Sequence, residues 1–127
     1  MLLYITLGSN DIERAQLFYD ALLAPLGMVR LMTDDSECGY AASDDTRCRL
    51  WIVTPFNKRA ATIGNGSMVA LEPESRTAVD AFYHAGLAHG GTDEGAPGLR
   101  PYHESFYAAY VRDPDGNKIS AVCEKPM

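Results

Sequence analysis

Several features that would point to common functions are missing from this 127-residue chain. No run of Lys or Arg forms a basic stripe, and the net charge is −6 at pH 7, which argues against nucleic acid and anionic membranes as partners. No apolar stretch approaches the ~20 residues that cross a bilayer, and the N-terminus lacks the basic start and long apolar run of a secretion signal. These absences favour a cytoplasmic protein without a membrane partner.

Motifs for metal binding, phosphate binding and nucleophilic catalysis are scarce as well. The three cysteines, Cys38, Cys48 and Cys123, are an odd number without metal-type spacing, so we expect reduced and mostly buried thiols. Gly64-Asn65-Gly66 lacks the Lys and the strand–helix context of a phosphate-binding loop. No Ser-His-Asp or Cys-His arrangement can be assembled from spacing.

The sequence does contain a long internal repeat. A shift of 64 positions places Tyr4-Ile5-Thr6-Leu7 on Met68-Val69-Ala70-Leu71, and Phe18-Tyr19 on Phe82-Tyr83. Two copies are too few for a solenoid, so the repeat indicates two related modules that enclose a cleft. We expect a single domain over residues 1–127, with a first module at 1–56, a linker at 57–66 and a second module at 67–127.

Each module is predicted to run strand, helix and three strands. In the first, the pattern predicts a strand at 2–8, a helix capped by Asn10 or Asp11, and strands near 28–33, 38–43 and 48–54. In the second, it predicts a strand at 67–72, a helix capped by Ser75, a loop from Gly95 through Pro101, and a hairpin of 106–112 and 117–123. The expected fold class is α+β, with two βαβββ modules in a pseudo-twofold arrangement. Their mixed sheets form a concave cleft, with the helices outside.

Side-chain alternation along the strands predicts which residues see this cleft. The more apolar face of each strand must lie under a helix, which assigns Leu50, Ile52, Ile119 and Ala121 to the helix side. The opposite face then carries the predicted ligand cleft, which consists of Tyr4, Thr6, Arg49, Trp51, Met68, Ala70, Lys118 and Ser120.

The chain resembles the vicinal oxygen chelate superfamily, which holds glyoxalase I, bleomycin-resistance proteins and extradiol dioxygenases. The resemblance rests on the paired modules, on the opening 7–15 segment followed by Phe18-Tyr19, and above all on the 110–117 segment Tyr-Val-Arg-Asp-Pro-Asp-Gly-Asn. It implies a divalent metal held by His or Glu side chains from the first and last strand of each module. Those positions hold Tyr4, Trp51, Met68 and Ser120 here. Because Trp cannot ligate, Met suits only soft metals, Ser ligates rarely and Tyr ligates weakly, we expect no metal cofactor.

Three hypotheses follow. The first is a metal-free binding module whose cleft takes a small molecule, as bleomycin-resistance-type relatives do, with Arg49 and Lys118 attracting a polar or anionic group. The second is a lyase or isomerase of the glyoxalase type, which uses a divalent metal or a metal-free acid/base such as His103 or Tyr107. The third is that assembly into a homodimer matters most, because relatives of this size usually pair as homodimers in which the partner chain can complete the cleft. The sequence does not separate intrachain from swapped pairing of the modules.

Overall fold

The computed structural model describes residues 1–127 and shows the same order of elements in both halves. The first half contains β1 (Ile5–Gly8), α1 (Ile12–Leu23), β2 (Met28–Thr33), β3 (Glu37–Ala42) and β4 (Leu50–Val53). The second half contains β5 (Val69–Leu71), α2 (Arg76–Ala88), β6 (Thr92–Leu99), β7 (Tyr107–Arg112) and β8 (Lys118–Cys123). The predicted pair of βαβββ modules is confirmed.

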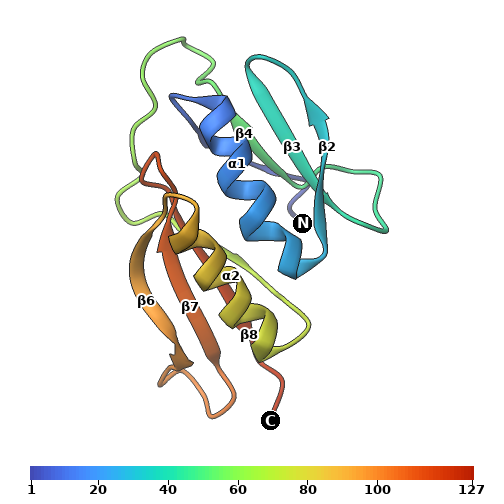
Figure 1. Cartoon of the computed structure of the whole chain (residues 1–127), viewed down its shortest axis with the longest axis vertical. Helices are drawn as coiled ribbons and strands as arrows, with labels where there is room; N and C mark the ends of the chain where they lie inside the picture. The colour runs from blue at the N-terminus through green and yellow to red at the C-terminus, as the bar shows by residue number, and fades with distance from the viewer.

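Each module forms its own four-stranded mixed sheet. The strand orders are β1-β4-β3-β2 and β5-β8-β7-β6, with the first strand of each module parallel to the last and the remaining pairs antiparallel. Figure 1 shows α1 and α2 lying side by side in front of the strands, and the two helices contact each other. The fold is therefore α+β as predicted: the helices cover one face of the sheets, and we call the opposite one the helix-free face. Neither helix is long and apolar enough to cross a membrane.

Local sequence explains where the helices begin and end. The Asp11 carboxylate accepts a hydrogen bond from the backbone N–H of Arg14, and the Ser75 hydroxyl does the same for Ala78. The first helix tightens into a 3-10 turn at Ala24–Leu26 and stops at Gly27, whose φ of 74° lies in the left-handed region that glycine adopts without strain.

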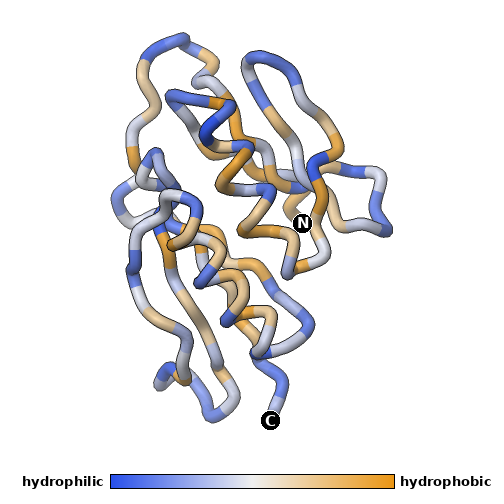
Figure 2. The backbone as a smooth tube through the Cα atoms, viewed as in Figure 1, coloured by the Kyte–Doolittle hydropathy of each residue, from blue (hydrophilic) through white to orange (hydrophobic).

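One hydrophobic core serves both modules. Its 17 buried residues come from both helices and both sheets, and they include the predicted helix-side residues Leu50, Ile52, Ile119 and Ala121. Figure 2 shows the hydrophobic colour concentrated along helices and strands and the hydrophilic colour at the tips of the connections. The alternation predicted from the sequence is therefore confirmed for the helix side of β4 and β8. The inner face of α2 is formed by Val79, Phe82 and Tyr83.

The predicted loop from Gly95 through Pro101 is wrong over most of its length, because Thr92–Leu99 forms the strand β6. Its register against β7 shifts twice, between Asp93 and Gly95 and between Gly95 and Gly98. An edge strand pairs on one side only, so Pro97, which has no N–H to donate, is tolerated where the pairing is interrupted.

The turn between β7 and β8 joins the second module to the first. The Asp113 carboxylate, 3% exposed, accepts hydrogen bonds from the backbone N–H groups of Asp115 and Asn117 and, at 2.5 Å, from the Tyr19 hydroxyl on α1. Asn117 donates through its side chain both to Asp113 and to the carbonyl oxygen of Gly8 at the end of β1. A buried polar network thus fixes the two modules relative to each other.

Candidate functional site

The helix-free face carries a chain of four hollows, which we call the groove. The linker hollow, of about 600 Å³, and the Trp51 hollow, of about 530 Å³, share Thr6, Glu37 and Val53. The junction hollow, of about 310 Å³, lies between β1 and β5 and shares Tyr4 with the Trp51 hollow. It shares Met68 with the Tyr110 hollow, of about 550 Å³, on the second sheet. The groove therefore runs across both modules.

The Trp51 hollow is an apolar depression on the first sheet. Trp51 is paired with Thr6 on β1 and with Gly39 on β3. A Cβ atom at position 39 would lie 2.9 Å from the indole ring and 2.8 Å from the sulfur of Cys48, so a glycine is needed for the ring to occupy its place. Tyr4 is 50% exposed beside it. A flat aromatic surface is thus available to a ligand.

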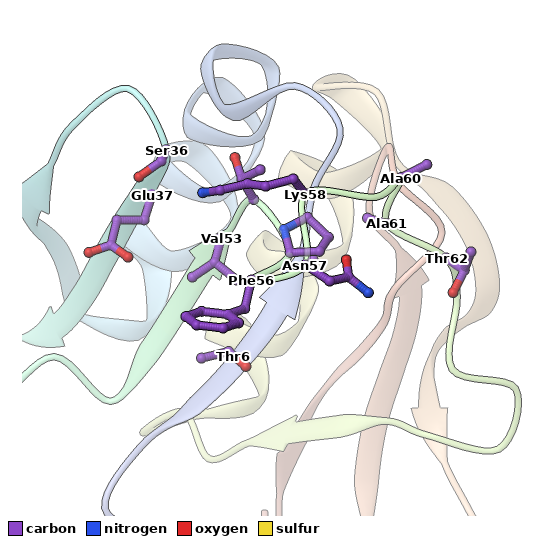
Figure 3. Close-up of a pocket in the computed structure, with 13 residues that line it drawn as sticks. Thr6, Ser36, Glu37, Val53, Phe56, Asn57, Lys58, Ala60, Ala61 and Thr62 are labelled. Carbon is purple, nitrogen blue, oxygen red and sulfur yellow. The ribbon is translucent and has the colours of Figure 1, made fainter.

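The linker hollow is more polar. Figure 3 shows Phe56 and Lys58 reaching from the segment after β4 across this hollow, with Ser36 and Glu37 on its other side. Phe56 is 98% exposed, and Lys58 has a φ of 65°, a conformation that is uncommon for a residue other than glycine.

The structure spreads the predicted cleft residues along the groove rather than around one enclosed cavity. Tyr4, Thr6 and Trp51 line the Trp51 hollow; Tyr4, Arg49, Met68 and Ala70 line the junction hollow; Met68 and Lys118 line the Tyr110 hollow. Arg49 is held by the Asp45 carboxylate at 3.2 Å and by the carbonyl oxygen of Leu3. Ser120 is fully buried, and its hydroxyl donates to the carbonyl oxygen of Ala109.

The positions that would hold a metal do not offer a suitable set of donor atoms. Tyr4 and Met68 share the junction hollow, while Trp51 lies in its own hollow and Ser120 is already hydrogen-bonded within the sheet. Divalent metal ions in protein sites take carboxylate, imidazole or thiolate ligands. No three of the His, Cys, Asp and Glu side chains lie close enough together to hold a metal ion.

His103 lies outside the groove hollows, with both ring nitrogens engaged. The backbone N–H of Ser105 donates to Nδ1 at 3.1 Å, so the proton of the neutral ring sits on Nε2, which lies 2.6 Å from the Glu124 carboxylate. The ring also packs edge-on against Phe106. Sequence spacing gave no sign of this contact, because His103 and Glu124 are 21 residues apart.

Tyr107 lies on the helix side of β7, packed against the core and away from the groove. Its hydroxyl donates to the Asp80 carboxylate on α2 at 2.6 Å, and the Arg76 guanidinium lies 5.1 Å from the ring centroid. The hydrogen bond to Asp80 is the main cause that raises the pKa of Tyr107. The structure thus separates the two predicted acid/base residues from the predicted ligand-cleft residues.

Comparison with solved structures identifies the family. A glyoxalase/bleomycin resistance protein from Albidiferax ferrireducens T118 is 41% identical to this chain, covers 98% of both chains and superposes with a TM-score of 0.86. This chain belongs to the glyoxalase/bleomycin resistance/dioxygenase superfamily. A glyoxalase-related enzyme from Fulvimarina pelagi (21% identity, 97% of this chain and 87% of that one, TM-score 0.75) shares the fold. So does a lactoylglutathione lyase from Agrobacterium tumefaciens (19% identity, 97% and 92%, TM-score 0.66). Comparisons with family models and with curated proteins gave no match.

Membership of the glyoxalase/bleomycin resistance/dioxygenase superfamily agrees with the resemblance seen in the sequence. The 113–117 segment, the most specific part of that resemblance, is the turn that ties the modules together in the structure. Sequence reasoning missed Arg100, which lines the groove beside Lys118, because it fell within the predicted loop. It also missed Phe56 and Lys58, which lie in or next to the predicted linker.

Proposed function

We propose that this chain binds a small organic molecule in the groove and does so without a metal ion. The observation that carries the proposal is the set of half-exposed apolar side chains on the helix-free face, among them Tyr4 at 50% and Met68 at 45%. Soluble proteins rarely expose apolar side chains in a contiguous patch, and hollows that combine apolar walls with a few polar groups are typical of small-ligand sites. Thr6, Glu37 and Lys58 supply the polar groups on the first sheet.

The donor atoms at Tyr4, Trp51, Met68 and Ser120, the four positions expected to hold a metal, support the metal-free form of this proposal. A phenol, an indole, a thioether and a hydroxyl that already donates within its sheet stand there in place of the carboxylates and imidazoles that a catalytic divalent ion requires. The binding energy would instead come from apolar contact, at about 25 cal/mol for each Å² removed from water.

The test combines metal analysis with ligand binding. The purified protein is expected to contain no stoichiometric zinc, nickel, iron or manganese by elemental analysis, and a chelator should leave its melting temperature unchanged. A thermal-shift screen of small aromatic and aliphatic compounds should yield stabilising ligands that also change the fluorescence of Trp51, the single tryptophan.

Variants locate the binding site. Met68→Ala should weaken a stabilising compound about fivefold, because a contact of about 1 kcal/mol is removed from the groove. Leu87→Ala, on the exposed side of α2, is the matched control and should leave the affinity unchanged. Bound metal at one equivalent, or equal weakening by both variants, would contradict the proposal.

The remaining expectations stay predictions. We expect a homodimer, because pairing would cover exposed apolar residues such as Leu31, Met32 and Tyr102, and sedimentation equilibrium measures it directly. We expect a cytoplasmic location, since the chain has three buried free thiols. The lyase or isomerase alternative is tested by assaying His103→Gln and Tyr107→Phe against the wild-type chain; loss of turnover in either would favour it.

A further inference from the structure

The Tyr110 hollow contains two cations that no carboxylate neutralises. It is lined by Met68, Arg100, Tyr102, Phe106, Tyr110 and Lys118, together with Glu94 and Gly95. Glu94 is the one acidic side chain of this lining, and the Arg112 guanidinium binds it. A chain with a net charge of −6 therefore concentrates unpaired positive charge at this place.

Arg100 is held in position by the irregular strand β6. Its Nη2 donates to the carbonyl oxygen of Ala96 at 2.6 Å, and its guanidinium carbon lies 5.4 Å from the centroid of the Tyr110 ring. A Cβ atom at Gly95 or Gly98 would come within 3.2 or 3.1 Å of the guanidinium nitrogens. Glycine at both positions therefore leaves space for the guanidinium, which the hydrogen bond to Ala96 holds at this place.

Lys118 approaches the same aromatic ring. Its ammonium nitrogen lies 5.5 Å from the Tyr110 centroid and makes no salt bridge or hydrogen bond within the chain. The guanidinium of Arg100 bonds only to the carbonyl oxygens of Ala96 and Leu99, so it also keeps N–H groups free. Both cations thus line one hollow with donors that the chain itself does not use.

Apolar and aromatic surface adjoins this charge. Tyr102 is 73% exposed and packs edge-on against Phe106 at a centroid distance of 4.9 Å. Met68 connects the hollow to the junction hollow and so to Tyr4. A ligand that places an anion at the cations has an apolar wall beside it.

We propose that Arg100 and Lys118 form an anion-recognition subsite, so that the molecule bound in the groove is an organic anion. Its oxyanion, a carboxylate or a phosphate monoester, accepts hydrogen bonds from both side chains, and its apolar part lies against Tyr102 and Phe106 and extends toward Met68. This inference rests on the proposed function and adds to it the chemical class of the ligand.

Methionine methyl groups can report where a probe binds. Only Met32 and Met68 of the five methionines line the groove, the first on the Trp51 hollow and the second on the Tyr110 hollow. The chain with isotope-labelled methionine methyls would be titrated by NMR with 3-phenylpropionate, phenethyl phosphate, 3-phenylpropanol and inorganic phosphate. Met68→Leu and Met32→Leu assign the two signals.

Both organic anions should shift the Met68 signal, and the tighter of them should bind at least about tenfold more tightly than the neutral alcohol, as expected for a charge-assisted hydrogen bond. The anion that binds more tightly shows whether the subsite prefers a carboxylate or a phosphate monoester. Lys118→Gln and Arg100→Gln should each remove most of this preference. Arg59→Gln, an exposed cation outside the groove hollows, is the charge-matched control and should change the affinity by less than about twofold, because exposed charges are screened.

The outcomes separate this inference from the proposed function. Equal binding of the alcohol and the organic anions, or equal loss in Arg59→Gln and Lys118→Gln, would overturn the anion subsite and leave small-molecule binding standing. Inorganic phosphate that binds as tightly as the organic anions would overturn the role of the aromatic wall. No shift at either methionine with any compound would count against binding in the Trp51, junction and Tyr110 hollows. Lys118→Gln keeps the test usable if Arg100→Gln disturbs β6, because no hydrogen bond of the chain depends on the Lys118 ammonium.

Discussion

The buried hydrogen bond between Tyr19 and Asp113 offers a quantitative test of how the two modules are joined. Tyr19 on α1 is fully buried, and its hydroxyl lies 2.5 Å from the carboxylate in the β7–β8 turn of the other module. Burial raises the pKa of Tyr19, and the neighbouring Asp113 charge raises it further, so the phenol stays protonated and donates at neutral pH. Tyr19→Phe removes this donor and keeps the ring.

The size of the effect follows from the partners that remain. A hydrogen bond to a charged group contributes about 1.5–3 kcal/mol, and Asp113 keeps donors from the backbone of Asp115 and Asn117 and from the Asn117 side chain. We therefore expect Tyr19→Phe to lower the free energy of unfolding by about 2 kcal/mol. For a chain of this length the melting temperature should fall by about 8 °C.

Urea unfolding at neutral pH measures this loss. Far-UV circular dichroism follows both modules, while fluorescence of Trp51 in β4 follows the first, so coincident transitions establish that the chain unfolds as one unit. Tyr40→Phe is the matched control. It removes a 2.8 Å bond to Asp20, whose side chain is 41% exposed and also binds Arg30, so water can replace the donor and about 1 kcal/mol or less should be lost.

A loss of stability in Tyr19→Phe no larger than that in Tyr40→Phe would refute this role of the buried hydrogen bond. So would a midpoint lowered through a changed dependence on urea rather than through stability, since the slope reports the surface exposed on unfolding.

Two further predictions concern the groove and alkaline pH. Gly39→Ala should cost about 1–3 kcal/mol in urea unfolding, because the new methyl group would overlap the Trp51 ring and the Cys48 sulfur, and it should shift the Trp51 emission maximum; an unchanged spectrum would contradict the packing described. Stability should begin to fall above about pH 8.5, where unfolded thiols lose their protons, because burial raises the pKa values of Cys38 and Cys48 in the folded state. It should fall more steeply above about pH 10, because the pKa values of Tyr19 and Tyr40 are raised in the folded state while unfolded tyrosines lose their protons near that pH. Urea midpoints measured from pH 8 to 11 should show a shallower decline in Tyr19→Phe, and a steeper one would refute this linkage.

The sequence predicted the module order because the signals are local. Alternation in β4 and β8 identified the residues under the helices, and the 64-residue repeat aligned the first module with the second. The strand β6 was not predicted, because Gly95, Pro97 and Gly98 are residues typical of loops and only their pairing with β7 makes them a strand. Pairing within the sheet outweighed the preference of these three residues for a loop.

The candidate site was predictable only in part, for a related reason. Which face a strand residue takes can be inferred from alternation, whereas what it meets there depends on distant segments. The hydrogen bond of Arg49 to the carbonyl oxygen of Leu3, the burial of Ser120 and the contact of His103 with Glu124 all change what these side chains can do. The role of Arg100 in binding can be inferred only from the structure, in which its guanidinium lies over the Tyr110 ring.

The shared core also bears on the ancestry of such a chain. A lone βαβββ unit would expose the side of its helix that packs against the other helix, where Leu22 of α1 lies against the Gly86 turn of α2. Two identical copies of such a unit would cover this side by pairing. Fusing two copies replaces a concentration-dependent encounter with an intramolecular one. It also frees each copy to change by itself: here one half carries an indole on its open face and the other an arginine and a lysine.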